Sequence, residues 1–567
     1  MRLPVSPALA LALAGSTLIV ACGGAPPPAP SAPPPPATAA PIADAPPTPP
    51  APPRDPFAIP DDLREEPAAL MTPPSTNLTL MPYPPAPPGV PKPPATCGAF
   101  VKRRAAGKVP ACAERGPALS ALDAALRESD EAKRDGALVA LESCAGLPSG
   151  LIRALRADLA PVTCADAIVE PLLEKPPKTL TSPIYNTLMG QALAGRMARL
   201  GAGMPVLAPP FDKQRVIAWL GGPMVEWLRT QGEAIQVTAE VGAKLSYYGR
   251  AVVAVEAGMA DMRMVDAARA APLPDEFAKD VELRTVYYGA LDDALEPRKA
   301  RGRDAALVGL ADFAAVGALR DDRVTRARTL LSKLYGGRRI DALDPLIFPP
   351  GADASLTDTK LSLAARLPTF YAGVLLDAKD ATDPAMLKVL LTRGVPAPFR
   401  KALREAAPLS GEPRDLVTRA RLAFAAQYWR AFDVDEAVRL AAGPKEGTRS
   451  DAQTLFLAVA LALRGGPANA ADMMHRAPLE KIGIGDVAAL DKTADGSGPF
   501  AALAAYDAAV IRETAAPAEA DAAYWKSVEA SYKKAAAKTD APALRTKAEA
   551  GAKHAAELAA AIPVSAR

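Results

Sequence analysis

The chain has very little histidine, few aromatic residues and almost no net charge, and each shortage excludes a class of function. Its 567 residues include two histidines, His475 and His554, and neither has a usable partner in the sequence. Histidine-dependent catalytic triads and histidine-ligated metal sites are therefore disfavoured. A formal net charge of +3 argues against a dedicated nucleic-acid-binding protein. Aromatic residues make up 5% of the chain, whereas alanine, the best helix former, is abundant.

Long apolar runs are also scarce, and the run at the N-terminus has the build of an export signal. A charged start is followed by an apolar stretch over residues 8–21, which is shorter than the roughly 20 residues that span a bilayer. The stretch ends in Ile19-Val20-Ala21-Cys22, which resembles the lipobox of bacterial lipoproteins. The resemblance implies that the mature chain starts at Cys22 and is held in a lipid bilayer by at least two acyl chains. The alternative is an ordinary signal peptide with an incidental cysteine.

The residue after the cysteine bears on where the protein is delivered. Gly23 stands where lipoproteins that are kept at the inner membrane carry aspartate. The resemblance to this class therefore implies delivery to the outer membrane, in an organism that has one.

Proline is concentrated in the segment that follows. Nearly half of the 61 prolines fall between Pro26 and Pro94. Such runs favour polyproline II and cannot bury a core. We expect residues 22–96 to form a disordered tether that reaches on the order of 200 Å when fully extended.

After Cys22, cysteine is confined to one short region. The four remaining cysteines are an even, clustered set: Cys97, Cys112, Cys144 and Cys164. In an exported chain this pattern predicts two disulfides, for which three pairings exist. We favour Cys97–Cys112 and Cys144–Cys164, because each closes a short loop and a loop of about 15 residues contributes roughly 3 kcal/mol. The rival, a zinc site, lacks both the C-x₂-C spacing and a nearby histidine. No metal and no other cofactor is expected.

From Pro117 onward the apolar residues recur at helical spacing, and no convincing alternating strand is present. The clearest stripes are Leu119, Leu122 and Leu126; Leu151, Leu155 and Leu159; and Val241, Leu245, Tyr248 and Val252. Proline and glycine breakers separate these segments. The sequence therefore predicts an all-α fold.

Two internal echoes indicate how the helices are arranged. Tyr247-Tyr248-Gly249 recurs as Tyr287-Tyr288-Gly289 at an offset of 40, a period typical of paired-helix solenoids. Glycine inside a helix costs about 1 kcal/mol relative to alanine, so we expect a close helix crossing at each glycine. Segments 416–442 and 455–477 resemble degenerate tetratricopeptide repeats, although their period drifts and key residues are missing. The resemblance implies a helix-hairpin α-solenoid, similar to a TPR or HEAT superhelix, with a concave binding face. Chance similarity between Ala-rich helices is the alternative.

These observations divide the chain into five parts. They are a lipoprotein signal peptide (1–21), the lipidated cysteine with its Pro-rich tether (22–96), a disulfide-stapled helical cap (97–175), a helical repeat domain (176–350) and a TPR-like helical repeat domain (351–567).

Three motifs that carry catalysis elsewhere occur here without their companions. Ser531 and Lys534 match S-x-x-K, but the S-D-N and K-T-G elements of that family are missing. The segment 483–488 matches G-x-G-x-x-A, but a helix is expected before it where the motif needs a strand, and Asp486 is better explained as a helix cap. Glu142-Ser143 resembles the start of the lytic transglycosylase motif, but the Gly-Leu-Met-Gln-type continuation is absent.

The remaining candidate is a series of basic residues between Arg298 and Arg339. Acidic residues are interleaved with them, which favours a solvated, salt-bridged surface over a docking face for phosphorylated lipid or an acidic protein. Taken together, the sequence predicts a membrane-anchored envelope lipoprotein that acts as a protein-interaction scaffold for unidentified envelope proteins and is not an enzyme. The alternative is an envelope glycan hydrolase or lytic transglycosylase on an α-superhelix.

Overall fold

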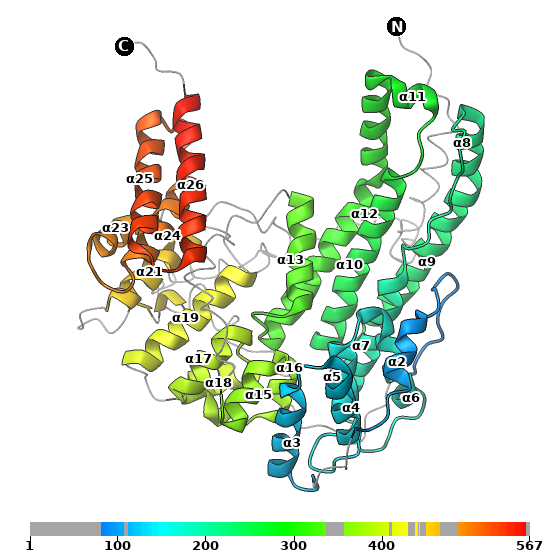
Figure 1. Cartoon of the computed structure of the whole chain (residues 1–567), viewed down its shortest axis with the longest axis horizontal. Coiled ribbons are helices and arrows are strands. Elements are labelled where there is room, and N and C mark those ends of the chain that lie inside the picture. Colours follow the sequence, from blue (N-terminus) through cyan, green and yellow to red (C-terminus); the bar gives the residue numbers. More distant parts are fainter. Residues whose placement is uncertain are drawn as a thin grey trace, which may run out of the picture. The chain divides into compact units, whose positions relative to one another are not determined.

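The fold was analysed in a computed structural model, which describes residues 81–106, 112–335, 356–406, 411–428, 437–439, 441–442, 450–464 and 486–562. Throughout these ranges the regular structure is helical, and an isolated bridge between Ala318 and Gly394 is the nearest approach to a strand. The all-α prediction is therefore confirmed (Figure 1). The signal peptide, Cys22 and the tether as far as residue 80 lie outside the described residues.

The chain forms two compact units, and each is described by itself. The described part of unit 1 is residues 204–229 and 271–297, and the remaining described residues form unit 2. Unit 1 contains α8 (Lys213–Trp219), the π-helical turn η5 (Leu220–Met224), the start of α9 (Val225–Gly242), α11 (Asp275–Lys279) and the first part of α12 (Val281–Val316). It ends at Pro297, a proline inside α12.

Unit 2 begins with a region of short helices crosslinked by two disulfides. The helices are η3 (Ala95–Cys97), α2 (Gly98–Val101), α3 (Arg115–Arg127), α4 (Glu131–Leu141), α5 (Leu151–Leu159), η4 (Val162–Cys164), α6 (Ala165–Glu174) and α7 (Ser182–Arg199). Two disulfides form, as predicted, but the favoured pairing is wrong: Cys97 joins Cys164, and Cys112 joins Cys144. The Cα atoms are 5.1 and 5.3 Å apart, within the usual range for a disulfide.

Helix packing explains the pairing. Helices α3 and α4 pack as a hairpin, which brings Cys112 before α3 to Cys144 after α4. Cys97 ends η3 and Cys164 ends η4, so the other disulfide joins the ends of two 3₁₀ turns. The entropy of loop closure changes slowly with loop length, so the preference for short loops was too weak to decide the pairing.

The end of the Pro-rich segment lies on these helices. Polyproline II leaves its backbone carbonyls unpaired, and side chains of unit 2 donate to four of them. Arg199 Nε donates to Pro91 O at 2.8 Å, and Arg196 Nη1 donates to Pro84 O at 2.9 Å. Gln231 Nε2 and the Tyr185 hydroxyl donate to the carbonyls of Gly89 and Met81. Residues 81–91, which we had placed in the tether, therefore pack against the helical body.

Helix α10 (Tyr247–Arg269) is buried along most of its length and packs on α7 and on α13 (Asp322–Tyr335). A Cβ atom added to Gly190 of α7 would lie 2.5 Å from Gly249 Cα, and a Cβ on Gly249 would overlap the Asn186 carbonyl. The close crossing predicted at Gly249 is confirmed. At Gly289 no heavy atom lies within 4 Å of the corresponding position, so the two halves of the 40-residue echo are packed differently.

A further correction concerns the apolar stripe from Val241 to Val252. We expected one continuous helix, but α9 ends at Gly242 and α10 begins at Tyr247. A turn that contains Leu245 separates them, and Leu245 is nevertheless buried.

The second half of unit 2 is a succession of helices in which α17 packs on α19 and, from α19 onward, each described helix packs on the next. The helices are α15 (Thr359–Arg366), α16 (Thr369–Leu375), η7 (Ala378–Thr382), α17 (Pro384–Arg393), α18 (Ala397–Glu405), α19 (Gly411–Tyr428), α21 (Asp451–Arg464), α23 (Val487–Asp495), α24 (Ala501–Thr514), α25 (Ala522–Lys538) and α26 (Pro542–Ala561). Helices α19 and α21 are the first helices of the two predicted TPR-like pairs. Most of their expected second helices lies outside the described residues.

Candidate functional site

Glu142, the acidic residue compared with that of transglycosylases, is bound to two arginines and has a structural role. Glu142 follows α4, and its Oε1 accepts from Arg153 Nε at 2.9 Å and from Arg156 Nη1 at 2.5 Å. Its Oε2 forms an ion pair with Arg153. Arg156, which is 5% exposed, also binds both oxygens of Asp135. A glycosidase acid must reach a glycosidic oxygen, whereas both oxygens of Glu142 are already bound to guanidinium groups.

The basic residues after position 298 are salt-bridged, as expected, but several of their partners are buried acids on another helix. Arg298 and Arg301 of α12 both bind Asp261 of α10, which is 1% exposed. Arg326 of α13 binds Glu256, also on α10 and fully buried, and burial raises the pKa of Glu256 despite this partner. The charges are therefore paired between helices, with the acids buried and with Arg301 and Arg326 34% and 33% exposed. The interleaving of acids in the sequence suggested local pairs instead, and Arg303 with Asp304 is one such pair.

A buried polar cluster that the sequence did not reveal joins five helices of unit 2. The hydroxyls of Tyr248 and Tyr371 donate to Asp158 Oδ2 at 2.7 and 2.5 Å, and Arg323 forms an ion pair with the same carboxylate. Arg323 Nη2 also donates to Gln191 Oε1 at 2.6 Å. Burial raises the pKa of both tyrosines and lowers that of Arg323 to about 10. Every member is sealed from solvent, so we assign the cluster to positioning α5, α7, α10, α13 and α16.

The remaining catalytic motifs also have structural roles. Ser531 Oγ donates to the Ser527 carbonyl in its own helix, and Lys534 binds Asp495, so the two residues of S-x-x-K have separate partners. Asp486 caps α23 by accepting from Ala489 N at 3.2 Å, as predicted. His554 is 3.9 Å from Glu513, beyond hydrogen-bond distance. His475 and residues 483–485 lie outside the described residues.

Metal-binding clusters and membrane-spanning helices are two further features that would indicate a function. In the described ranges, no group of three or more His, Cys, Asp and Glu side chains is placed to hold a metal ion. Nor does any helix in those ranges combine the length and apolarity needed to cross a membrane.

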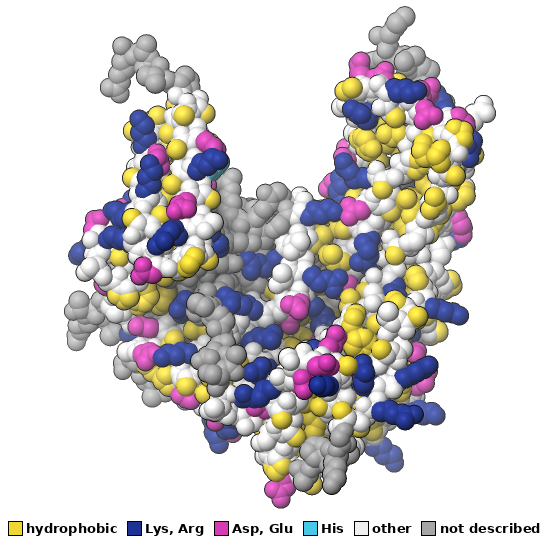
Figure 2. Space-filling view, viewed as in Figure 1, with side chains coloured by type: hydrophobic (Ala, Val, Ile, Leu, Met, Phe, Trp, Pro, Cys, Tyr) yellow, Lys and Arg dark blue, Asp and Glu magenta, His cyan; other side chains and the backbone are white. Residues whose placement is uncertain are grey.

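The surface feature that does call for an explanation is in unit 1. Across the described residues, seven large hydrophobic side chains are exposed, and five of them belong to this small unit: Val206, Ile217, Val281, Leu283 and Val286. Val206 is 89% exposed, and the first six residues of α12, 281–286, are all exposed. Figure 2 shows hydrophobic side chains gathered on the surface around α8 and α11. Concentrations of exposed apolar residues mark interaction sites more often than scattered ones do.

The charge of unit 1 limits what this surface can bind. Residues 204–229 and 271–297 contain nine carboxylates and five basic side chains. An acidic surface is repelled by anionic lipid headgroups and by nucleic acid, and it attracts basic partners. The candidate site is therefore an apolar, acidic surface suited to a protein that presents apolar and basic side chains. Comparisons of the chain with protein-family models, with curated proteins and with solved structures found no match.

Proposed function

We propose that this chain is an envelope lipoprotein, anchored through acylated Cys22, that serves as a helical scaffold for protein binding. The observation that carries the proposal is the concentration of exposed hydrophobic side chains in unit 1. The pairing of Glu142 with two arginines is consistent with binding rather than hydrolysis.

We further propose that the helices from α15 to α26 form a helix-hairpin solenoid. Support comes from the packing of each described helix on the next from α19 to α26. A solenoid of this kind presents an extended surface that can bind a protein partner.

The binding surface is tested by charge substitutions at matched positions. Val286→Asp and Ile217→Asp place a carboxylate on unit 1, and Val237→Asp and Val101→Asp place one at similarly exposed positions of unit 2. In a pull-down from detergent-solubilised envelopes, the wild type and the unit 2 variants should recover a partner protein. The unit 1 variants should recover at least tenfold less of it. Equal recovery by all four variants would contradict the assignment of the surface to unit 1.

The anchor and the enzyme alternative have their own tests. Cys22→Ser should release the protein from the membrane fraction, and wild-type protein should show an acyl mass at its N-terminus. Purified wild-type protein should not degrade peptidoglycan. Robust degradation that is lost in Glu142→Gln, with folding unchanged, would replace the scaffold by a glycan hydrolase.

A further inference from the structure

A large basic pocket in unit 2 has no role in the proposed scaffold. Its volume is about 1410 Å³, which exceeds that of typical small-molecule sites. Four basic side chains line it: Arg320, which precedes α13, Arg419 of α19, Lys538 of α25 and Lys547 of α26. Asp495 and Asp540 are its acidic residues, and Asp495 is already bound to Lys534. The pocket therefore carries an excess of positive charge.

Arg419 is the side chain in this pocket that most needs a partner. Its Nε is buried and has no hydrogen-bond partner. Arg320 is close enough to repel it, and burial together with this repulsion lowers the pKa of Arg419 to about 10. The other arginines of the interior, such as Arg199 and Arg156, donate to carboxylates and carbonyls. A guanidinium held beside another cation in a concave site is arranged to receive an anion.

The backbone contributes donors from two helices. The residues at the second and third positions of α24, Ala502 and Leu503, line the pocket. The equivalent residues of α26, Ala543 and Leu544, line it as well. At these positions the N–H groups have no partner within the helix, and the helix dipole favours negative charge.

The helix caps of the C-terminal bundle distinguish the same two helices, α24 and α26, from their neighbours. Helices α23 and α25 are capped by Asp486 and Asp521, whose side chains accept backbone N–H bonds. Helices α24 and α26 begin after Phe500 and Ala541, with no side-chain cap and no acidic residue in the first turn. The two N-termini that face the pocket are thus the two in this bundle that are left without a side-chain acceptor.

From this arrangement we infer that the pocket is a binding site for a phosphate-bearing anion, held by Arg419 and Arg320 and by the N-termini of α24 and α26. Guanidinium groups and free helix N-termini are both donors that suit phosphate oxygens. Leu503, Leu544 and neighbouring alanines line the same pocket and would contact a less polar part of the ligand. The phosphate can belong to a soluble molecule or to a lipid headgroup, and the experiment separates these sources.

The test uses the full chain as Cys22→Ser, so that an acyl anchor cannot contribute to lipid binding. Pyrophosphate is titrated by calorimetry, and vesicles containing phosphatidic acid are compared with vesicles of phosphatidylcholine alone in a flotation assay. Arg419→Gln removes the unpartnered guanidinium, and Arg414→Gln is its control on the same helix. Ala502→Asp places a carboxylate at the second position of α24, where it should stabilise the helix through the dipole but repel the ligand.

We expect one of the two probes to bind, with affinity reduced about tenfold or more by Arg419→Gln and by Ala502→Asp and unchanged by Arg414→Gln. Binding of pyrophosphate assigns the site to a soluble phosphate compound, and binding of phosphatidic acid vesicles alone assigns it to a lipid headgroup. Thermal melts control for folding, since neither pocket variant should lower the melting temperature. If neither probe binds, or if binding is insensitive to both pocket variants, the proposal is overturned.

Discussion

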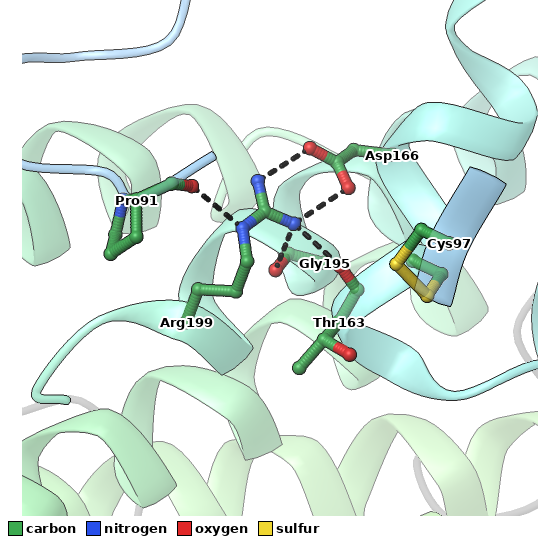
Figure 3. Close-up of a disulfide and its surroundings, with 7 residues drawn as sticks. Pro91, Cys97, Thr163, Asp166, Gly195 and Arg199 are labelled. Carbon is green, nitrogen blue, oxygen red and sulfur yellow. Dashed lines mark hydrogen bonds and ion pairs between the residues drawn. A yellow bond between two sulfur atoms is a disulfide. The ribbon is translucent and has the colours of Figure 1, made fainter. Parts of the chain in front are cut away.

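Two regions of unit 2 are built from short packed helices and treat buried charge in opposite ways. In the disulfide-bonded region, residues 95–199, Arg199 is 6% exposed and each of its three guanidinium nitrogens donates a hydrogen bond. It binds both oxygens of Asp166 at 2.7 Å and the carbonyls of Pro91, Thr163 and Gly195, as Figure 3 shows beside the Cys97–Cys164 disulfide. This part of the chain is held by two disulfides and by buried ion pairs such as Arg199 with Asp166.

The C-terminal bundle, α23 to α26, contains no cysteine and is packed through alanine. Small side chains such as Ala508 and Ala555 fill its interior, and Gly551 of α26 lies against the ring of Tyr532. Asp507 of α24 is fully buried there, and neither of its carboxylate oxygens has a hydrogen-bond partner. Close helix packing thus stabilises this bundle in the presence of an uncompensated acid. The comparison teaches that the two regions should respond differently to reduction, to loss of a charge and to pH.

The largest effect should come from the disulfides. Replacing Cys97 and Cys164 together by serine opens a loop with a sequence separation of 67 residues, and the chain-entropy model predicts a loss of about 4 kcal/mol. Hydrogen exchange of the full chain should show faster exchange over 95–199 and little change over 486–562. Equal loss of protection in both regions would show that they unfold as one cooperative unit and would end the comparison.

Breaking the Arg199 ion pair should have the next largest effect. Arg199→Met leaves Asp166 buried without a partner, and chemical denaturation should show a loss of about 3 kcal/mol, the lower end of the range for a broken buried pair. The double variant Arg199→Met/Asp166→Leu should recover much of this loss, since apolar replacements of a buried pair are often tolerated. Arg229→Met is the control, because Arg229 and Glu226 form an exposed pair worth at most about 1 kcal/mol. A loss below that of the control would mean that the pair contributes little to stability.

The sequence was sufficient for the class of fold and insufficient for the long-range pairs. Helical spacing and breakers gave helices such as 151–159, because an amphipathic stripe is a local property. The cap at Asp486 and the close approach at Gly249 were also predictable, since each follows from a residue type at a defined place in a helix. Local patterns identified these features without knowledge of the tertiary structure.

Features that depend on which helices meet were missed. The disulfide pairing was assigned wrongly because the α3–α4 hairpin, and not loop length, brings Cys112 to Cys144. The ion pair of Arg301 with Asp261 spans 40 residues, so it could not be separated from local alternatives such as Asp304. The pocket around Arg419 gathers residues from four distant segments. Its sequence signal, two helix starts without a polar cap, is recognisable only when the helix boundaries are known.

The smallest effect, and the one that distinguishes the two regions most sharply, concerns Asp507. Burial raises the pKa of this carboxyl well above its usual value. A group whose pKa is higher in the folded state contributes its full stability below the unfolded pKa, near 4, and loses it as the pH rises toward the folded value. Wild-type protein should therefore lose stability in the C-terminal bundle as the pH rises above about 4.

Asp507→Asn keeps the shape of the side chain and removes its charge. At neutral pH this variant should be more stable than wild type by about 2 kcal/mol, because an unpaired buried charge is costly. As the pH falls below about 4 the difference should shrink, since the wild-type carboxyl then becomes protonated in both states. Hydrogen exchange over 486–562 as a function of pH measures the effect. Asp491→Asn provides the control, because Asp491 is partly exposed and bound to Arg512, and its loss should not stabilise the bundle. If Asp507→Asn destabilises the bundle at every pH, the carboxyl has a partner in solution. The contrast between the paired Arg199 and the unpaired Asp507 must then be given up.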